Sequence, residues 1–341
     1  MFREEASREG FARAGIARAG EPPGFARFRD WLGAGRHAGM SYLERTRDVR
    51  GDPELLLPGA RSIVCLSAAY DAAPYRARDG ATLARYARGA DYHGTLRGRA
   101  ERVLAAVRRR LQGAWRARVC VDSTPLAERA FAAAAGLGWI GKNGCLIDPD
   151  RGSWLLLAEI VTDLDLPEDA PVAERCGGCV RCLAACPTGA FLEPGLLDAS
   201  RCLAYWTIEH RGPLPGSVKA SLADRVFGCD ICQEVCPWNE VPGEPAPSAA
   251  EAPTRAEWLA MGPGEWRRRF GRTALNRAGR RGVQRNAAAS AGAAGDRALL
   301  PALARAARVV EPGLADAAAW SCARLGGPPA APDPLPAAPG G

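Results

Sequence analysis

The residues of this chain with the clearest chemical signature are four cysteines in the segment CGGCVRCLAACP. They are Cys176, Cys179, Cys182 and Cys186, and Pro187 follows them directly. This C-x2-C-x2-C-x3-C-P spacing wraps three thiolates around one face of a 4Fe–4S cube and directs the fourth thiolate toward a second cube. Zinc sites use paired C-x2-C units or histidines instead. The spacing therefore predicts iron–sulfur chemistry, which is electron transfer, rather than a structural zinc site.

A second cysteine motif, CDICQEVCP, begins at Cys229 and lacks one ligand. In bacterial ferredoxins each half supplies four cysteines, but the position where the fourth would stand is Val226. The other cysteine in this part of the chain is Cys202. With Cys202 as the substitute, exchange of one cysteine between the halves completes two ligand sets without a remainder. The predicted sets are Cys176, Cys179, Cys182 and Cys236 for one cube, and Cys186, Cys202, Cys229 and Cys232 for the other.

Four further cysteines, Cys65, Cys120, Cys145 and Cys322, lie in apolar segments. We expect them to pack in the core, since a free cysteine behaves as a small apolar residue. Twelve cysteines in all favour metal ligation in a reducing compartment. The first residues show neither a secretory signal nor a twin-arginine pair, and no run of about 18 apolar residues occurs. We therefore expect a cytoplasmic protein without a membrane span.

Positive charge is concentrated toward the C-terminal end. The formal net charge of the 341-residue chain is +7, but residues 255–308 hold twelve arginines and three acidic residues. The densest stretch, residues 266–285, holds eight arginines and no acid. Arginine guanidinium groups bind phosphate and release counterions, so this stretch predicts a polyanionic partner such as RNA. The alternative is a solvated arginine-rich surface in a chain that has only two lysines.

The residues upstream of the cysteines have the pattern of mixed α/β structure. Apolar, partly β-branched segments predict buried strands at residues 62–70, 117–122 and 152–166. A helix is expected over residues 96–115, where apolar residues recur at helical spacing. Another helix is expected over residues 124–138, with Thr124 as its N-cap and Pro125 at its first position.

The C-terminal part has the pattern of a helical repeat. Residues 280–326 are rich in alanine and break at GAAGD and EPGL, as two short helical hairpins that stack would do. Residues 241–254 have the Pro/Ala-rich composition of a linker or loop. The expected divisions are an α/β (α+β) N-terminal domain (1–168), a ferredoxin-like domain for two 4Fe–4S clusters (169–245), HEAT-like helical repeats (255–327) and a disordered tail (328–341).

No familiar cofactor fingerprint is present to receive the electrons. The segment GLGWIG at residues 136–141 matches G-x-G-x-x-G only by letter, because it ends a helix instead of opening one. There is no phosphate-binding P-loop, and His37, His93 and His210 are too scattered to form an evident haem or metal site. The electron acceptor is therefore predicted to be a cofactor that the chain holds without an evident covalent or metal ligand.

The order of the motifs resembles that of the epoxyqueuosine reductases. The matching segments are DSTPLAERAFAAAAGLGWIGKNGCLI, CGGCVRCLAACPTGAF, RCLAYWTIEHRG, CDICQEVCPWN and RGVQRNAA. The resemblance implies an enzyme with two 4Fe–4S clusters and a base-off cobalamin in the N-terminal domain. It implies reduction of epoxyqueuosine to queuosine at the wobble position of tRNA, the last step of queuosine biosynthesis. The alternatives are a reductive dehalogenase-like enzyme and an electron-transfer adaptor without a corrinoid.

The resemblance also implies particular site residues. Asp122 takes the place of the family's catalytic acid, and burial there is expected to raise its pKa and keep it protonated. The alternative role for Asp122 is to satisfy the start of the helix that follows it. Arg50, Asp122, Asp230 and Ile231 match positions that contact cobalamin, whereas His93 is not expected to ligate cobalt.

The expected partners are an RNA and an electron donor. In the family, the junction between the ferredoxin-like part and the repeats holds RNA, so the resemblance implies tRNA contacts from the basic stretch. Electrons are expected from an unidentified low-potential donor, and the protein is expected to be a monomer because tRNA must reach an open face. Lys142 and Asn143, in the segment GKN, also match a family signature. The predicted tRNA-binding residues are Arg267, Arg268, Arg269, Arg272, Arg280, Arg281 and Arg285.

Overall fold

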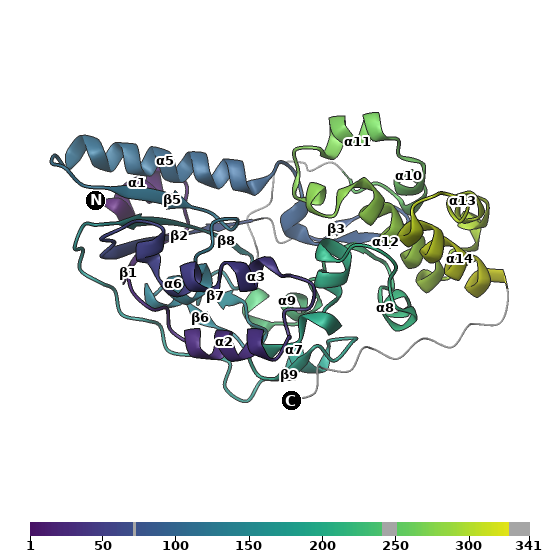
Figure 1. Cartoon of the computed structure of the whole chain (residues 1–341), viewed down its shortest axis with the longest axis horizontal. Helices are drawn as coiled ribbons and strands as arrows, with labels where there is room; N and C mark the ends of the chain where they lie inside the picture. Colours follow the sequence, from purple (N-terminus) through teal and green to yellow (C-terminus); the bar gives the residue numbers. More distant parts are fainter. Residues whose placement is uncertain (71–72, 241–250, 327–341) are drawn as a thin grey trace.

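The computed structural model describes residues 1–70, 73–240 and 251–326. In Figure 1 a sheet with its helices lies at the left, the cysteine-rich segment lies toward the middle, and the helical C-terminal part lies at the right. This arrangement has the mixed α/β character and the helical end that were expected. The expected tail (328–341) and residues 241–250 of the expected linker lie outside the described residues.

A four-stranded antiparallel sheet forms the centre of the N-terminal part, with the strand order β1-β2-β8-β5. β2 (Ser62–Ala69) and β8 (Leu155–Thr162) are the central pair, and most of their residues are buried. Both strands were predicted, although β8 is shorter at each end than the apolar run 152–166. The outer strands are β1 (Arg13–Arg18) and β5 (Ala117–Cys120).

Helices cover both faces of this sheet. α1 (Phe2–Arg8) and α5 (Tyr92–Arg110) cover one face, and α5 begins about one turn earlier than predicted. α6 (Glu128–Ala134) covers the other face, where its residue Phe131 is buried. The buried residues of α5 recur at helical spacing and are Leu96, Ala100, Val103 and Val107.

The segment before α6 is a loop rather than the first turn of a helix. Thr124 is not the N-cap as predicted, because α6 begins only at Glu128. The Thr124 N–H donates to Val121 O, which closes a turn within residues 121–127. Asp122 lies in this loop with a φ of +36°, a left-handed conformation that is strained for a residue with a Cβ atom.

A small three-stranded sheet joins the N-terminal part to the cysteine-rich segment. β3 (Tyr75–Arg76) pairs with β4 (Thr82–Leu83), and β4 pairs in parallel with β11 (Arg225–Phe227). Val226 of β11 is fully buried in a core that also contains Trp258. A core residue therefore occupies the position where a symmetrical ferredoxin would carry its fourth cysteine.

The other elements of the first 240 residues are short. β6 and β7 form one hairpin, and β9 and β10 form another. A π-helical turn at Tyr205–Glu209 follows Cys202, and such turns are frequent at functional sites. The elements are α2 (Phe25–Gly33), α3 (Tyr42–Arg45), α4 (Arg47–Gly51), β6 (Trp139–Ile140), β7 (Leu146–Ile147), α7 (Arg181–Ala184), β9 (Phe191–Glu193), β10 (Leu196–Leu197), α8 (Gly216–Ser221) and α9 (Ile231–Glu234).

The C-terminal helices form one body with the small sheet. The helices are α10 (Arg255–Ala260), α11 (Pro263–Phe270), α12 (Gly279–Ala294), α13 (Leu300–Ala306) and α14 (Pro312–Gly326). Both predicted breaks are confirmed, since α12 ends at Gly295 with a φ of +77° and a second break separates α13 from α14. Val283 of α12 shares a core with Leu83 of β4 and Phe227 of β11. This core runs across the boundaries that the sequence suggested.

Candidate active site

A large cavity of about 1960 Å³ opens where the parts of the chain meet. Arg50, His93 and Asp122 line it from the N-terminal part, Cys202 lines it from the cysteine-rich segment, and Arg277 lines it from the junction before α12. The residue expected to be the catalytic acid and one expected cluster ligand therefore face the same space.

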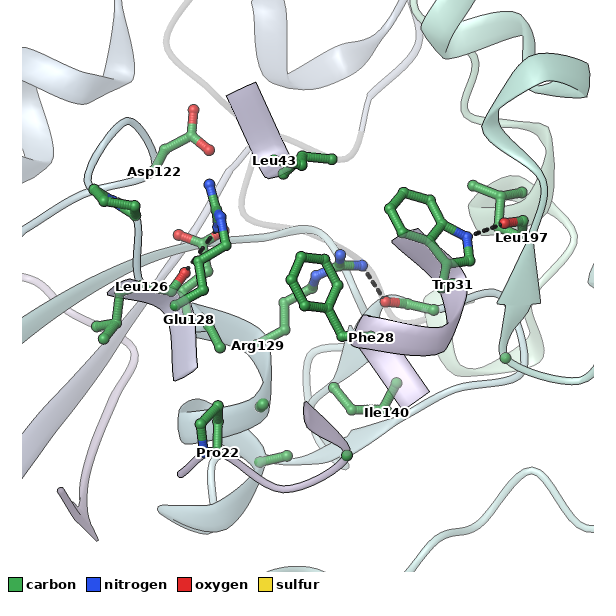
Figure 2. Close-up of a pocket in the computed structure, with 18 of the residues that line it drawn as sticks. Pro22, Phe28, Trp31, Leu43, Asp122, Leu126, Glu128, Arg129, Ile140 and Leu197 are labelled. Atoms are coloured by element: carbon green, nitrogen blue, oxygen red, sulfur yellow. Dashed lines mark hydrogen bonds between the residues drawn. The ribbon is translucent and has the colours of Figure 1, made fainter. Parts of the chain in front are cut away.

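α2 supplies an aromatic wall of this cavity. Phe28 and Trp31 lie across from Asp122 and Glu128 (Figure 2). Their rings stack with centroids 6.0 Å apart, and Trp31 Nε1 donates to Leu197 O at 2.6 Å. The cavity thus presents a flat apolar surface on one side and titratable groups on the other.

Two consecutive residues at the start of α5 hold the Asp122 carboxylate. Tyr92 Oη donates to Asp122 Oδ2 at 2.8 Å, and His93 Nε2 lies 2.7 Å from the same oxygen. The other ring nitrogen, His93 Nδ1, lies 2.6 Å from Asp91 Oδ1. Because ionised carboxylates only accept hydrogen bonds, the ring satisfies both contacts as an imidazolium with a proton on each nitrogen.

These hydrogen bonds decide where the proton resides. The hydrogen bond to Asp122 raises the pKa of His93 to about 9, with a further contribution from Asp91 and against burial, which lowers it. Burial acts to raise the pKa of Asp122, but the hydrogen bonds from His93 and Tyr92 outweigh it, so the pKa of Asp122 is lowered. The expectation that burial keeps Asp122 protonated is therefore wrong. At neutral pH the carboxylate is ionised and His93 carries the proton.

A second acidic side chain, Glu128, lines the cavity next to Asp122. Burial raises the pKa of Glu128 to about 7, and the negative charge of Asp122 adds to this effect. The main-chain N–H of Asp122 faces the Glu128 carboxyl group and acts in the opposite direction, as do the charges of Arg129 and Arg50. Two carboxyl groups six residues apart therefore have pKa shifts of opposite sign.

Two of the four predicted cobalamin contacts, Arg50 and Asp122, line the cavity. Arg50 Nη1 donates to Leu126 O at 3.2 Å, and burial lowers the pKa of its guanidinium. Asp230 and Ile231 are not among the described residues that line the cavity. Asp230 Oδ2 accepts the main-chain N–H of Arg85 at 2.8 Å, and burial raises the pKa of Asp230 to about 6.

The structure brings the first predicted set of cysteines together. All four of its members are among the residues that line one small cavity, namely Cys176, Cys179, Cys182 and Cys236. Lys142 lines it too, and its ammonium group donates to Gly177 O and, at 3.0 Å, to Cys179 O. One of the two lysines of the chain therefore ties this cysteine loop to the N-terminal part.

The second predicted set is also grouped. Cys202 interacts electrostatically with Cys186 and Cys229. Cys232 interacts with Cys229 and Cys202, and also with Cys145 and with Cys182 of the first set. In each case burial is the larger cause of a raised thiol pKa. Among the described residues no three histidine, cysteine or acidic side chains converge on a single-ion site. A 4Fe–4S cube does not require this, because each cysteine binds a different iron.

The other four cysteines pack as expected, to different degrees. Cys65 and Cys120 are buried beneath α6, and Cys322 is half-buried against the C-terminal helices. Cys145 is half-buried, and its N–H donates to Asn143 Oδ1 at 3.1 Å. Asn143 Nδ2 in turn donates to Cys232 O at 3.4 Å, so the GKN segment contacts both cysteine loops.

The arginines predicted to bind tRNA divide into an accessible group and one buried residue. The accessible members are the exposed Arg267, Arg268, Arg269, Arg272 and Arg281 and the half-buried Arg280. Arg285 is only 2% exposed and donates to three carbonyl oxygens, those of Trp206 at 2.7 Å, Gly212 at 2.8 Å and His210 at 3.0 Å. The prediction that Arg285 binds tRNA is wrong, because its guanidinium fixes the main chain between the π-helical turn and α8.

No role at the site follows from the sequence for several residues that line the cavity. Tyr92 and His93 lie 30 and 29 positions before Asp122, and nothing local to either segment indicates that they meet. Glu128 was missed because it was placed within a helix and not at its start. Arg277 was counted in the basic stretch but not singled out, although it lines the cavity and forms a bidentate pair with Glu209 at 2.6 and 2.9 Å.

Two four-cysteine sets beside a cavity that contains a proton-carrying Asp–His pair define an iron–sulfur oxidoreductase. Residues 175–239 match the family described as a 4Fe–4S double cluster binding domain. Residues 50–123 match the family described as Epoxyqueuosine reductase QueG, DUF1730.

Whole-chain relatives extend these matches. The epoxyqueuosine reductase of Xanthomonas campestris pv. campestris is 39% identical over 320 residues, which is 89% of this chain and 89% of the relative. That of Gloeobacter violaceus is 41% identical over 301 residues, which is 84% of this chain and 93% of the relative. The chain belongs to the epoxyqueuosine reductase family, and the resemblance seen in its motifs is confirmed.

Solved structures agree in fold. A crystal structure of an epoxyqueuosine reductase with an epoxyqueuosine-modified tRNA-Tyr stem loop is 30% identical, with a TM-score of 0.83 over 95% of this chain and 89% of the other. A structure of the enzyme from Bacillus subtilis, with its catalytic aspartate loop swung out of the active site, is 29% identical with the same TM-score and coverage. In the part of the chain described here, no helix has the length and apolar character needed to cross a membrane.

Proposed function

We propose that this chain reduces the epoxide of epoxyqueuosine at the wobble position of tRNA and so forms queuosine, the last step of queuosine biosynthesis. The family membership supports the reaction. The observation that supports roles for particular residues is the Asp122–His93 pair, which lies in a cavity that Cys202 also lines. Removal of an epoxide oxygen consumes two electrons and two protons, forms a C=C bond and releases water. The site thus combines a proton source with an expected electron path.

The cavity suits a large cofactor together with a nucleoside. Its volume of about 1960 Å³ exceeds the roughly 300–1,000 Å³ that ordinary small-molecule pockets enclose. The rings of Phe28 and Trp31 form a flat apolar surface, and the paired donors of the Arg50 guanidinium group suit a phosphate or amide oxygen. His93 is engaged at both ring nitrogens, which supports a cobalamin held without a histidine ligand. When bound, cobalamin would supply a low-potential reducing centre for the epoxide.

The proton chemistry follows from the arrangement of three side chains. His93 holds the transferable proton on Nε2, against Asp122 Oδ2. Asp122 positions this proton, and either group can present it to the departing oxygen, since the pair shares one hydrogen bond of 2.7 Å. The Tyr92 hydroxyl donates to the same oxygen of Asp122 and fixes its direction. The role expected of Asp122 as the acid is therefore proposed for the Asp122–His93 pair.

The two cysteine sets suggest the direction of electron flow. The set that contains Cys202 reaches the cavity, so its cluster would be the one that delivers electrons there. The set at Lys142 lies around a separate small cavity, beneath the exposed residues Gly177 and Gly178. We propose that an external low-potential donor reduces this cluster first. The Lys142 ammonium would lower the cost of the extra negative charge on reduction.

The basic surface before α12 is proposed to hold the tRNA. Arg267, Arg268 and Arg269 lie on α11, close in sequence to Arg277 at the cavity. Exposed guanidinium groups in this position can bind the phosphates of an anticodon arm while an unstacked base enters the cavity. The relative solved with a tRNA stem loop supports the same class of substrate for this chain.

Nucleoside analysis tests the proposal directly. The protein, reconstituted with both clusters and cobalamin, is incubated with epoxyqueuosine-containing tRNA and a strong reductant, and the tRNA is digested to nucleosides. We expect queuosine to form only when cobalamin is supplied. Absence of queuosine at every cobalamin concentration, with both clusters intact by absorption spectroscopy, would contradict the proposed function.

A further inference from the structure

A carboxyl group lies in the core directly behind the active-site loop. Glu159 of β8 is 1% exposed, and its Oε1 has no hydrogen-bond partner in the described part of the chain. In the sheet it is directly opposite Cys65 on one side and Cys120 on the other. Both cysteines pack beneath α6, so Glu159 faces the same helix. A buried acid without a full set of partners is costly and calls for an explanation.

Glu128 stands between this buried acid and the cavity. It is the first residue of α6, its side chain lines the cavity, and its carboxyl group faces the main-chain N–H of Asp122. Burial raises the pKa of Glu159 well above its usual value, and the charges of Glu128 and Asp122 add to this effect. The three carboxyl groups form a series in depth, because Glu159 lies in the core whereas Glu128 and Asp122 line the cavity.

The charged and titratable groups around this series are few. Glu128 faces two cations, two acids, one thiol and one phenol, while Glu159 faces two acids and two thiols. For Glu128 they are Arg129, Arg50, Asp122, Glu159, Cys65 and Tyr92, and for Glu159 they are Glu128, Asp122, Cys65 and Cys120. No cation faces Glu159 among these groups, so ionisation of both glutamates together would place two negative charges in a region of low dielectric.

The proposed reaction needs more protons than the Asp122–His93 pair holds. One proton resides on His93, and Asp122 is ionised, so the pair supplies one of the two protons that leave in water. We propose that Glu128 is the reserve acid that supplies the second proton, passing it to Asp122 or to water beside it, while Glu159 stays neutral behind it. This inference rests on the proposed function and assigns a role to a residue that the motifs do not single out.

Two electrons and two protons account for all the products of the proposed step. Both C–O bonds of the epoxide break, a C=C bond forms with two electrons from the clusters and cofactor, and the oxygen leaves as water. His93 gives up one proton and becomes neutral, and Glu128 gives up the other and becomes a carboxylate. Both protons are then regained from solvent through the cavity, to which His93 and Glu128 are open. Glu159 remains protonated throughout, because a neighbouring ionised Glu128 disfavours its own charge.

Infrared spectroscopy of the wild-type protein tests this without any turnover. The C=O band of a protonated carboxylic acid is followed in D₂O as the pH is varied. We expect two such bands to disappear near neutral pH, that of Asp230 at about pH 6 and that of Glu128 at about pH 7, and a third band to persist. Glu128→Gln should remove the band that titrates at about pH 7, Asp230→Asn the band at about pH 6, and Glu159→Gln the persistent band, which makes the last two matched controls. If Glu128→Gln leaves every titrating carboxyl band of the wild-type protein in place, the inference is overturned.

Single-turnover kinetics supply the second measurement. In the wild-type enzyme, queuosine formation should slow as the pH rises through about 7, because the reserve proton is then lost from Glu128. Glu128→Gln should slow the reaction about tenfold or more at pH 6 and remove that pH dependence, whereas Glu159→Gln should keep it. Wild-type rate and pH profile in Glu128→Gln would overturn the inference and leave the proposed function intact. No queuosine from the wild-type enzyme would instead contradict the proposed function.

Discussion

The cavity and the core behind α6 hold the same kind of side chain in opposite states. In the cavity, the Asp122 side chain is 48% exposed and receives hydrogen bonds from Tyr92 and His93, and its pKa is lowered. In the core, Glu159 has an oxygen without a partner, and its pKa is raised. The difference shows that a carboxyl group with hydrogen-bond donors at an accessible surface holds a charge, whereas one that is buried without a full set of donors holds a proton.

Arginine shows the same contrast in the C-terminal part. Arg268 on α11 is exposed to solvent, whereas Arg285 on α12 is buried and donates to three main-chain carbonyl groups. Both belong to one basic stretch of the sequence. An arginine in this stretch can therefore either bind a partner or stabilise the fold, and the residues that surround it determine which.

The largest expected effect comes from removing the charge of the cavity carboxylate. Asp122→Asn should lower single-turnover queuosine formation by about 10²–10⁴-fold, because an amide no longer holds the His93 proton against the departing oxygen. The matched control is Asp91→Asn, which keeps an acceptor oxygen for His93 Nδ1 and for the start of α5 but removes the second negative charge at His93, and should cost less. Near-normal turnover in Asp122→Asn, with clusters and corrinoid binding intact by absorption, would contradict the assigned role.

The next effect concerns the pH range in which the pair works. The pKa of His93 is raised to about 9, so its proton, and the stability that its ion pair contributes, are present at neutral pH and lost as the pH rises through about 9. His93→Gln should abolish that alkaline decline in activity. The melting temperatures of wild-type and variant should converge above this pH. An unchanged alkaline decline in the variant would assign it to another group.

A smaller effect separates the two kinds of arginine. Arg285→Ala should lower the free energy of unfolding by about 3 kcal/mol, because it leaves buried carbonyl groups without donors. Replacing Arg267, Arg268 and Arg269 by alanine should change stability by less than about 0.5 kcal/mol each. The triple variant should instead weaken tRNA binding and flatten its dependence on salt. Denaturant unfolding measures the stability, and filter binding at several salt concentrations measures the tRNA affinity. Equal tRNA affinity of the triple variant and the wild type would indicate that α11 is a solvated surface that does not bind tRNA.

The smallest effect is a gain in stability. Folded Glu159 keeps its proton to a higher pH than unfolded Glu159, so wild-type stability falls as the pH rises above the ordinary glutamate range. Glu159→Gln should therefore raise the melting temperature at pH 8 and leave it nearly unchanged at pH 4. A variant that is destabilised equally at both pH values would show that Glu159 is retained for packing.

The sequence was most informative where chemistry depends on spacing along the chain. Ligand spacing led to Cys202 as the substitute for the position of Val226, and the structure groups Cys202 with its expected neighbours. The periodicity of apolar residues likewise located β2, β8 and α5 within a few residues. These features depend on local geometry, which a linear pattern can express.

Other features depend on contacts between distant segments, and the sequence could not reveal them. His93 becomes significant only because the start of α5 lies against the loop of Asp122. Arg285 is buried because the main chain of residues 206–212 packs against it. The loop itself was mistaken for a helix start because Thr124 and Pro125 form a good capping signal. A turn closed by the Val121 carbonyl prevails there over that local preference.

The burial of Val226 limits which segments of this chain can be removed or exchanged. It packs with Trp258 and Val283 in a core that β3, β4, β11 and the C-terminal helices share. A truncation that removes the helices would leave this side of the cysteine-rich segment bare to solvent. A chimaera that exchanges the helices with those of a relative would need matching residues on all three strands. The C-terminal helices and the cysteine-rich segment can therefore be exchanged only as one piece.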